Sequence, residues 1–335
     1  MATGPPACGS EIARSLRIVF MGTPALAAHI LERLADACGD PANPGFDCEI
    51  VGVVTRPDRP RGRGLRLEPS EVAEVAERRG LKVLKPAKIR SEDFLTELRA
   101  LAPDVLVVAA YGRILPDAVL ETARIIPINV HASLLPRHRG ASPVEGAILA
   151  GDSMTGVTIM RVIGKMDAGP ILLARAIPLA PDETQGTLKE KLADLGATAL
   201  IEALALIARG AVTETPQDES LATYTTPVSK TDAFIDWNAQ ATAIERMVRA
   251  YDPWPIARTR LRGDELLIWR AAPGETPPSD PTAAPGTIVR IKPEVAVQCG
   301  RGRIVLLEVQ APGRKRISAA DFMRGRRVAS GERLG

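Results

Sequence analysis

Residues 126–140 read IPINVHASLLPRHRG, and the rest of the chain can be placed around them. The stretch opens with apolar side chains at every second position, which is typical of a buried strand. Because strand side chains repeat with a period of two, Asn129 and His131 leave the end of this strand on one face. The Leu135-Pro136 pair then forces a loop. Open α/β sheets bind ligands beyond the carboxyl ends of their strands, so this pair marks a candidate site.

The segment from 129 to 140 resembles the signature of the folate-dependent formyltransferases, and MDAGP at 166–170 resembles the acidic motif that completes the same site. Four further stretches resemble the branch of that family that formylates methionyl-tRNA: residues 17–24, 56–64, 235–237 and 252–255. The resemblance runs from about residue 16 to the C-terminus. The signature departs from the usual pattern at His138, where an aromatic residue is common, and at Ser142, Val144 and Glu145. These departures affect the surroundings of the site and not the reaction.

Strand-like and helix-like patterns alternate through the first half of the chain, which predicts an α/β fold with a doubly wound, Rossmann-like parallel sheet. Residues 104–110 form a continuous apolar run, the pattern of a central parallel strand. The other strands are expected at 16–24, 49–55, 81–84, 126–130, 156–162 and 171–179. The helices are expected at 25–37, 70–79, 91–101 (capped by Ser91), 142–150 and 187–209. We predict a catalytic domain over residues 1–210.

Periodicity fails between residues 211 and 230, which indicates a linker. Residues 231–335 then form a second domain, with one helix at 241–251 and a long flexible loop at 273–285. Its five short strands are expected at 257–261, 265–271, 286–291, 295–299 and 304–309. This pattern predicts a small β-barrel, and the resemblance implies an oligonucleotide-binding-like barrel that binds tRNA.

Three residues can carry formyl transfer to an amine, a reaction that passes through an oxyanion and requires a proton to move. Asn129 can donate an amide N–H to the oxyanion, His131 can shuttle the proton, and Asp167 can orient His131 and favour its protonated form. Each also has a simpler interpretation: an Asx-turn for Asn129, a satisfied interior histidine, and turn chemistry for Asp167. The intact signature favours the catalytic interpretation. No covalent nucleophile and no metal are required.

The resemblance implies a folate co-substrate, 10-formyltetrahydrofolate, bound by two segments near the catalytic residues. The predicted contacts are Ser133, Leu134, Leu135, Pro136, Tyr111, Gly112, Ile114 and Leu115. Leu134 and Leu135 can equally be core leucines beneath a loop, although an apolar slot also suits a pterin. Because X-Pro bonds in tight functional loops are sometimes cis, we predict a cis bond at Leu135-Pro136.

Arginines are concentrated in two places that we predict to bind tRNA. The loop at 56–66 carries Arg56, Arg59, Arg61, Arg63 and Arg66 against a single acid, Asp58, and the C-terminal part carries Arg314, Lys315 and Arg316. Arginines bind phosphate bidentately and stack on unpaired bases, but such runs are more often solvated loops. The resemblance implies that Arg63 reads the weak first base pair of initiator tRNA. For the cluster Arg324–Arg327, RNA contact and solubility are equally open interpretations.

The predicted function is therefore transfer of a formyl group from 10-formyltetrahydrofolate to the free amine of methionine on initiator tRNA. One alternative is a formyltransferase that acts on an amino-sugar nucleotide. Another is an RNA-binding barrel protein whose first domain is catalytically idle. A nicotinamide-dependent dehydrogenase is disfavoured, because only Gly22 follows the first strand where GxGxxG would be expected.

Composition adds expectations about compartment and partners. The net charge is +3, with 25 Lys+Arg against 25 Asp+Glu in residues 1–210 and 18 against 15 in the remainder. The four cysteines have no metal-site spacing and no CxxC, which favours a reducing compartment. Residues 1–13 do not have the pattern of a signal peptide, and no run is long and apolar enough for a membrane span. We expect a cytoplasmic monomer that does not associate with membranes.

Overall fold

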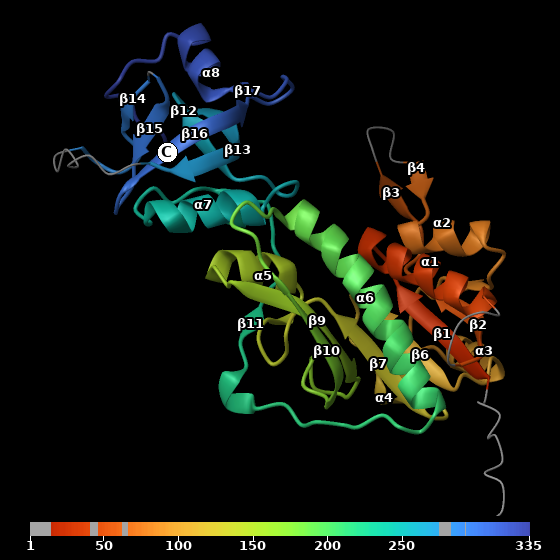
Figure 1. Ribbon diagram of the computed structural model, residues 1–335. Coiled ribbons are helices and arrows are strands. Elements are labelled where there is room, and N and C mark those ends of the chain that lie inside the picture. The colour runs from red at the N-terminus through yellow and green to blue at the C-terminus, as the bar shows by residue number, and fades with distance from the viewer. Residues whose placement is uncertain (1–14, 41–45, 62–65, 275–282, 292) are drawn as a thin grey trace, which may run out of the picture. The chain divides into compact units, whose positions relative to one another are not determined.

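The computed structural model describes residues 15–40, 46–61, 66–274, 283–291 and 293–335 (Figure 1). The chain divides into two compact units, each assembled from separate stretches of sequence. The N-terminal unit comprises Met1–Pro136, Val157–Arg175 and Leu192–Leu221. The C-terminal unit comprises Arg137–Gly156, Ala176–Lys191 and Ala222–Gly335.

A seven-stranded sheet has the strand order β10-β9-β7-β6-β1-β2-β5. Its strands are β1 (Leu16–Gly22), β2 (Cys48–Val54), β5 (Val83–Leu84), β6 (Val105–Ala109), β7 (Ile126–His131), β9 (Met154–Arg161) and β10 (Ile171–Pro178). The pairs from β7 through β6, β1 and β2 to β5 are parallel, whereas β9 runs antiparallel to β7. The apolar β6 lies between β1 and β7, as its composition predicted.

Helices cover both faces of this sheet, which confirms the doubly wound fold. They are α1 (Ala25–Gly39), α2 (Glu71–Arg78), α3 (Glu92–Ala100), α4 (Asp117–Leu120) and α6 (Gln185–Ala208). Phe94 and Leu98 of α3 pack in one core cluster with Val19 and Met21 of β1. On the other face, a Cβ atom at Gly196 of α6 would lie 3.1 Å from Val130 and 3.4 Å from Ile30 of α1.

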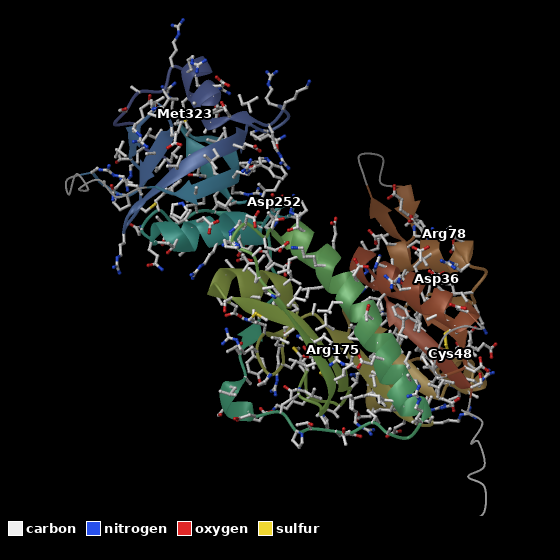
Figure 2. All side chains as sticks on the ribbon, in the orientation of Figure 1. Asp36, Cys48, Arg78, Arg175, Asp252 and Met323 are labelled. Atoms are coloured by element: carbon white, nitrogen blue, oxygen red, sulfur yellow. A yellow bond between two sulfur atoms is a disulfide. The ribbon has the colours of Figure 1, made fainter. Side chains whose placement is uncertain are left out.

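Polar contacts fix the neighbouring helices α1 and α2, whose Asp36 and Arg78 are labelled in Figure 2. Arg78 contacts Glu32 at 2.9 Å, and the pKa of that carboxyl is lowered by the hydrogen bond from Arg78. Ser91 is the N-cap residue of α3, as predicted, but its side chain makes no cap hydrogen bond and its hydroxyl donates to the Lys88 carbonyl. The short helix α4 was not predicted from the sequence.

The C-terminal unit contains a curled antiparallel sheet of the half-barrel type, which confirms the expected class of second domain. Its path is β12-β13-β16-β15-β14, and β17 pairs with β16. The bounds are β12 (Arg258–Leu261), β13 (Asp264–Pro273), β14 (Ile288–Arg290), β15 (Val295–Gln298), β16 (Arg303–Gln310) and β17 (Ile317–Ser318). The loop predicted at 273–285 lies mostly outside the described residues.

The C-terminal tail bridges the two ends of this sheet. Leu334 forms an antiparallel bridge with Leu261 at one edge, and Arg333 forms one with Thr287 at the other. The Leu334 side chain is 1% exposed and belongs to the core of the unit. Helix α7 (Ala241–Ala250) matches the expected helix, whereas α8 (Ala319–Gly325) and the strand β17 were missed.

The segment expected to be a linker makes specific contacts. It contains the 3-10 helix η1 (Glu219–Leu221) and the strand β11 (Tyr224–Thr225). β11 pairs in parallel with β8 (Arg139–Gly140), the last two residues of the signature stretch. Helix α5 (Pro143–Ala150) follows β8 within the C-terminal unit, where its Ala150 carbonyl accepts from Arg246 of α7. The boundaries 1–210, 211–230 and 231–335 stay a prediction.

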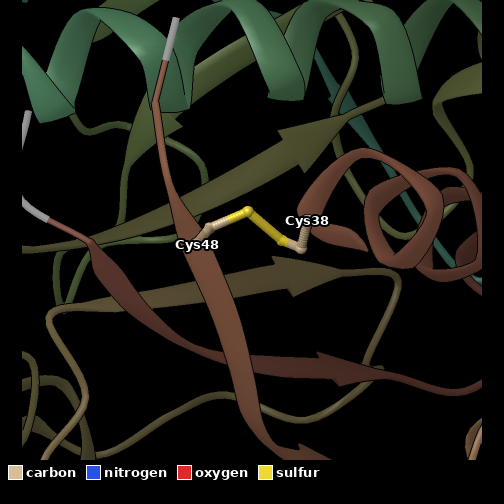
Figure 3. The surroundings of a disulfide bond; sticks show 2 residues. All are labelled: Cys38 and Cys48. Atoms are coloured by element: carbon tan, nitrogen blue, oxygen red, sulfur yellow. A yellow bond between two sulfur atoms is a disulfide. The ribbon is translucent and has the colours of Figure 1, made fainter. Parts of the chain in front are cut away.

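Cys38 and Cys48 form a disulfide that joins the end of α1 to the start of β2 (Figure 3). The sequence analysis did not anticipate this bond, and it removes the support that the cysteines gave to a reducing compartment. Cys299 is a buried free thiol, and burial raises its pKa to about 11. Within the described part of the chain, no helix combines the length and apolar character needed to span a bilayer.

Candidate active site

Neighbouring parallel strands bring the predicted site residues to one edge of the sheet. β6 and β7 pair in parallel, with Val105 opposite Ile126 and Ala109 opposite Val130. The two strands therefore end at the same edge of the sheet (Figure 1). Asn129 and His131 occupy the end of β7, and the segment 111–115 follows β6. This edge is where open α/β sheets place their ligands.

The structure brings Asp167 to the two residues of β7. Asn129 Nδ2 lies 3.5 Å from Asp167 Oδ1, and His131 Nδ1 lies 3.8 Å from Asp167 Oδ2. The side chains of His131 and Asp167 are 6% and 17% exposed. Such partial burial strengthens the interaction of a carboxylate with an imidazolium relative to bulk water. The three side chains that the sequence singled out therefore form one cluster.

The turn that carries Asp167 is tightly constrained. Val162 N donates to the Pro127 carbonyl at 2.9 Å, so the turn begins beside the first residues of β7 and then folds back toward Asn129. Asp167 has a φ of 47°, in the left-handed region that Asp tolerates better than most residues. A Cβ atom at Gly169 would overlap the Arg161 carbonyl oxygen, which explains why glycine stands there.

The cluster has the groups that acyl transfer to an amine requires. An amide donor, an imidazole and a carboxylate face one another in a partly dry environment. The amide can stabilise an oxyanion, and the imidazole can move a proton if the carboxylate holds its orientation. Within the described ranges, no group of three His, Cys, Asp or Glu residues could hold a metal ion.

One buried hydroxyl holds the loop after His131. Thr158 of β9, which is 0% exposed, donates from Oγ1 to the Ser133 carbonyl at 2.7 Å and accepts from Leu135 N at 3.1 Å. The Leu135-Pro136 bond is cis, as predicted. Ser133 and Leu135 are buried, whereas Leu134 and Pro136 are half-buried. The latter pair is therefore accessible to a ligand at this edge.

The loop after β6 offers both apolar and polar groups for the predicted folate. Tyr111 and Leu115 belong to the core cluster, whereas Gly112 and Ile114 are exposed. The Tyr111 hydroxyl is buried and has no hydrogen-bond partner among the described atoms. A buried hydroxyl without a partner is costly unless a ligand or water satisfies it. Its presence beside an apolar loop fits a ligand with polar edges, as a pterin has.

The arginine loop is only partly described. Residues Arg59–Arg61 (β3) and Arg66–Glu68 (β4) form an antiparallel hairpin, and Arg63 lies outside the described residues. The Arg56 guanidinium donates to the Gly112 carbonyl, and its pKa is lowered by burial and then by Arg59 and Arg113. Arg56 therefore supports the loop after β6, while Arg59 is exposed.

A second set of contacts orders the basic segment 314–316 of the C-terminal unit. The Arg316 guanidinium stacks on the Trp269 ring, 3.3 Å from its centroid. Gln310 accepts from the Trp269 indole at 2.8 Å and donates to the Arg314 carbonyl at 2.6 Å. Arg314, Lys315 and Arg316 are all exposed. The segment therefore presents its charges to solvent from a fixed backbone.

The departures from the usual signature are accommodated by polar contacts in the C-terminal unit. His138 Nε2 lies 2.7 Å from an oxygen of Asp152, whose other oxygen accepts from Arg137 at 2.6 Å. Glu145 is buried and pairs with Lys189 at 2.9 Å. Both side chains are thus held by polar partners within the same unit.

The sequence matches the formyl transferase family over residues 16–204 and its C-terminal domain over residues 227–327. The chain belongs to the formyl transferase family. The methionyl-tRNA formyltransferase of Methylococcus capsulatus is 45% identical over 320 residues, covering 96% of this chain and 100% of the relative. The protein of the same name from a Roseiflexus species is 48% identical over 321 residues, covering 96% and 95%. The prediction of a formyltransferase enzyme is confirmed.

Solved structures show the same fold in more distant formyltransferases. An N-formyltransferase from Helicobacter canadensis, solved with folinic acid and dTDP-3-aminofucose, has a TM-score of 0.64 at 15% identity. The match covers 87% of this chain and 98% of the Helicobacter protein. HypX from Aquifex aeolicus, solved with tetrahydrofolic acid, has a TM-score of 0.58 at 18% identity and covers 95% and 49%. These similarities establish the fold of the formyltransferase and leave its substrate to other arguments.

Several residues of the formyltransferase site were not found from the sequence. Thr158 and Gln217 contact the backbone of the signature loop and of the acidic turn. Trp269 and Gln310 order the basic segment. A hydroxyl in the apolar strand run at 156–162 was a usable signal for Thr158, since a buried polar group requires a partner. No local pattern marked Gln217.

Replacing Thr158 with valine keeps the side-chain shape and removes the hydroxyl. We expect the Thr158→Val variant to lose about 1–3 kcal/mol of unfolding free energy, because it leaves the buried Ser133 carbonyl and Leu135 N–H without their partner. Urea denaturation measures the change. Thr158→Ser, which keeps the hydroxyl, is the matched control. If both variants lose the same stability, the hydroxyl does not hold the loop.

Proposed function

We propose that the protein transfers the formyl group of 10-formyltetrahydrofolate to the free amine of methionyl-tRNA, with Asn129, His131 and Asp167 as its catalytic residues. The reaction is supported by relatives named methionyl-tRNA formyltransferase that match nearly the whole chain. The roles of the three residues are supported by their convergence at the sheet edge, at 3.5 and 3.8 Å from Asp167. This convergence is the observation that carries the assignment.

Each residue has a distinct part in the transfer. The amine nitrogen forms a bond to the formyl carbon, and the bond from that carbon to the folate nitrogen breaks. Asn129 donates an N–H to the oxygen on which negative charge develops. His131 takes the proton that the amine loses and returns one to the departing folate nitrogen, so protons balance. Asp167 orients the imidazole and stabilises its charged form.

The folate contacts are proposed on the surface that the two loops leave accessible. Leu134, Pro136 and Ile114 supply apolar contact, and Gly112 lets backbone polar groups approach. The remaining predicted contacts, Ser133, Leu135, Tyr111 and Leu115, are buried and form the wall behind them. Their side chains therefore shape the slot from behind.

Initiator tRNA is proposed to bind through the arginine hairpin and the segment 314–316. Arg59 is exposed in the hairpin, and Leu67 of the same hairpin is 69% exposed. Exposed apolar and guanidinium groups together suit stacking on unpaired bases, which a weak first base pair provides at low cost. Arg314, Lys315 and Arg316 supply phosphate contacts. Arg61, Arg63 and Arg66 are proposed on the resemblance alone.

Two further properties stay predictions from the sequence. A charged tRNA is a substrate of the ribosome, which favours a cytoplasmic location, whereas the Cys38–Cys48 disulfide is unusual in a reducing compartment. The monomeric state is predicted from the lack of a large apolar seam in the sequence. Sedimentation of the purified protein would measure that state directly.

A formyl-transfer assay with purified initiator methionyl-tRNA and labelled 10-formyltetrahydrofolate tests the function. We expect the tRNA to be formylated and a nucleotide-linked amino sugar to remain unmodified, since the basic segments would have no use with a small acceptor. The amino-sugar alternative has support from the solved relative with dTDP-3-aminofucose, although that relative is only 15% identical. Formylation of the sugar alone would overturn the proposal, and no turnover would favour an idle domain.

Replacing His131 with alanine tests the proton transfer. We expect turnover to fall by about 10²–10⁴-fold, with the affinity for tRNA nearly unchanged, because the imidazole acts on the reacting amine and not on the RNA. Initial rates and binding by filter retention measure the two quantities. His29→Ala is the matched control, since His29 is exposed and pairs with Asp194 away from the cluster. A loss confined to tRNA binding would refute this role for His131.

Replacing Arg63 with alanine tests the selection of the acceptor. We expect kcat/KM to fall for initiator tRNA far more than for an elongator methionyl-tRNA, because this arginine is proposed to read the weak first pair. Each lost phosphate contact should also lower the salt dependence of binding by about one unit. Arg90→Ala, an exposed arginine elsewhere in the unit, is the control. Equal losses for both tRNAs would make Arg63 only a phosphate contact.

A further inference from the structure

Gln217 makes two hydrogen bonds to the backbone of the turn that carries Asp167. Its Nε2 donates to the Asp167 carbonyl at 2.9 Å and to the Gly169 carbonyl at 2.7 Å. A primary amide has two N–H groups, and both are used here on carbonyls that flank Ala168. The side chain therefore fixes two peptide planes of a three-residue segment whose first member bears the carboxylate.

A backbone hydrogen bond of 2.9 Å from Arg161 N to the Pro170 carbonyl closes the turn at its base. Its internal backbone hydrogen bond, from Ala168 N to the Lys165 carbonyl, is long at 3.4 Å. Asp167 lies in the left-handed region, which costs a non-glycine residue of the order of 1–3 kcal/mol and persists only if surrounding contacts determine it. Gln217 supplies such contacts from a segment 50 residues away in sequence.

The residues around Gln217 hold it in register with the turn. We call residues 214–219 the strap. Thr215 exchanges two backbone hydrogen bonds of 2.8 Å with Ile171 on one side of the turn. Glu214 pairs with Arg161, and Glu219 pairs with Lys165 at 2.8 Å. The strap therefore contacts both arms of the hairpin that ends β9 and begins β10, and Gln217 lies between these anchors.

We propose that Gln217 is a positioning residue for formyl transfer: it holds the backbone of the turn so that the Asp167 carboxylate faces Asn129 and His131. This inference rests on the proposed catalytic role of Asp167. Gln217 acts through the turn and contacts two carbonyls, whereas the carboxylate it positions makes the contacts at 3.5 and 3.8 Å. Its loss should therefore affect turnover more than the binding of either substrate.

Gln217→Glu is the most informative substitution, because it keeps the side-chain shape. It replaces the two N–H donors with a carboxylate oxygen, which the Asp167 and Gly169 carbonyls would repel. Gln217→Ala removes the group without adding a charge. We expect both variants to lose about 10–100-fold in kcat, as for a catalytic group displaced by about an ångström, with KM for tRNA and folate within about twofold of wild type. Glu202→Gln is the matched control, because it makes the reverse exchange of acid and amide in a partly exposed ion pair, with Arg175, that does not involve the strap.

A double-mutant cycle with Asp167→Asn tests whether Gln217 acts through the acid. If it does, adding Gln217→Ala to Asp167→Asn lowers kcat no further, whereas independent roles would multiply. Hydrogen exchange over residues 164–170 should be faster in both Gln217 variants than in wild type or Glu202→Gln. Wild-type kcat in Gln217→Glu, multiplicative losses, or unchanged exchange would each overturn the inference. Failure of the wild-type protein to formylate any acceptor would instead overturn the proposed function, and the exchange data would remain decisive for the turn.

Discussion

The site depends on holding a carboxylate against an amide and an imidazole that belong to a different element. Asn129 and His131 belong to one strand, β7, and its alternation places both side chains on the same face. Asp167 sits 38 residues later than Asn129, in a turn with a left-handed residue at the carboxylate itself. The turn is held by its closing hydrogen bond from Arg161 to Pro170, by the close approach of Gly169 to Arg161, and by the hydrogen bonds from Gln217.

The signature loop is determined in the same way. Its backbone leaves β7 and turns at the cis proline bond, and the Thr158 hydroxyl satisfies one donor and one acceptor within it. Buried backbone groups without partners would cost about 1–3 kcal/mol each, so this single hydroxyl matters to the loop's conformation. In both cases a polar side chain from a distant segment binds main-chain groups beside a residue of the Asn129–His131–Asp167 cluster.

The features predicted correctly from the residues themselves are those that local patterns determine. The period of two placed Asn129 and His131 together, and the apolar run at 104–110 correctly indicated a central strand. Pairing of Asp167 with them came from resemblance, since no local pattern relates positions 38 residues apart. The tail that bridges the barrel edges, the β8–β11 pair and the Cys38–Cys48 disulfide were missed for the same reason. Ser91 takes the predicted N-cap position of α3, although its oxygen accepts no N–H of the helix.

The sequence predicted RNA contact for the segment 314–316 and left the cluster at 324–327 open, and the surroundings of the two clusters also differ. In the later cluster, Arg324 pairs with Asp321 at 3.0 Å and Arg326 lies 3.9 Å from Asp264, so nearby carboxylates offset its charge. Among the described residues, no carboxylate forms an ion pair with Arg314 or Lys315. Arg316 has an acidic neighbour in Asp252. Burial raises the pKa of that carboxyl, and the charge of Arg316 opposes the rise. The Arg316 guanidinium is also ordered by stacking on Trp269. An uncompensated charge on an ordered backbone attracts phosphate more strongly and loses less entropy on binding. Arg314 and Lys315 therefore present charge that no described ion pair offsets, whereas Arg324 and Arg326 share theirs with carboxylates of the same unit.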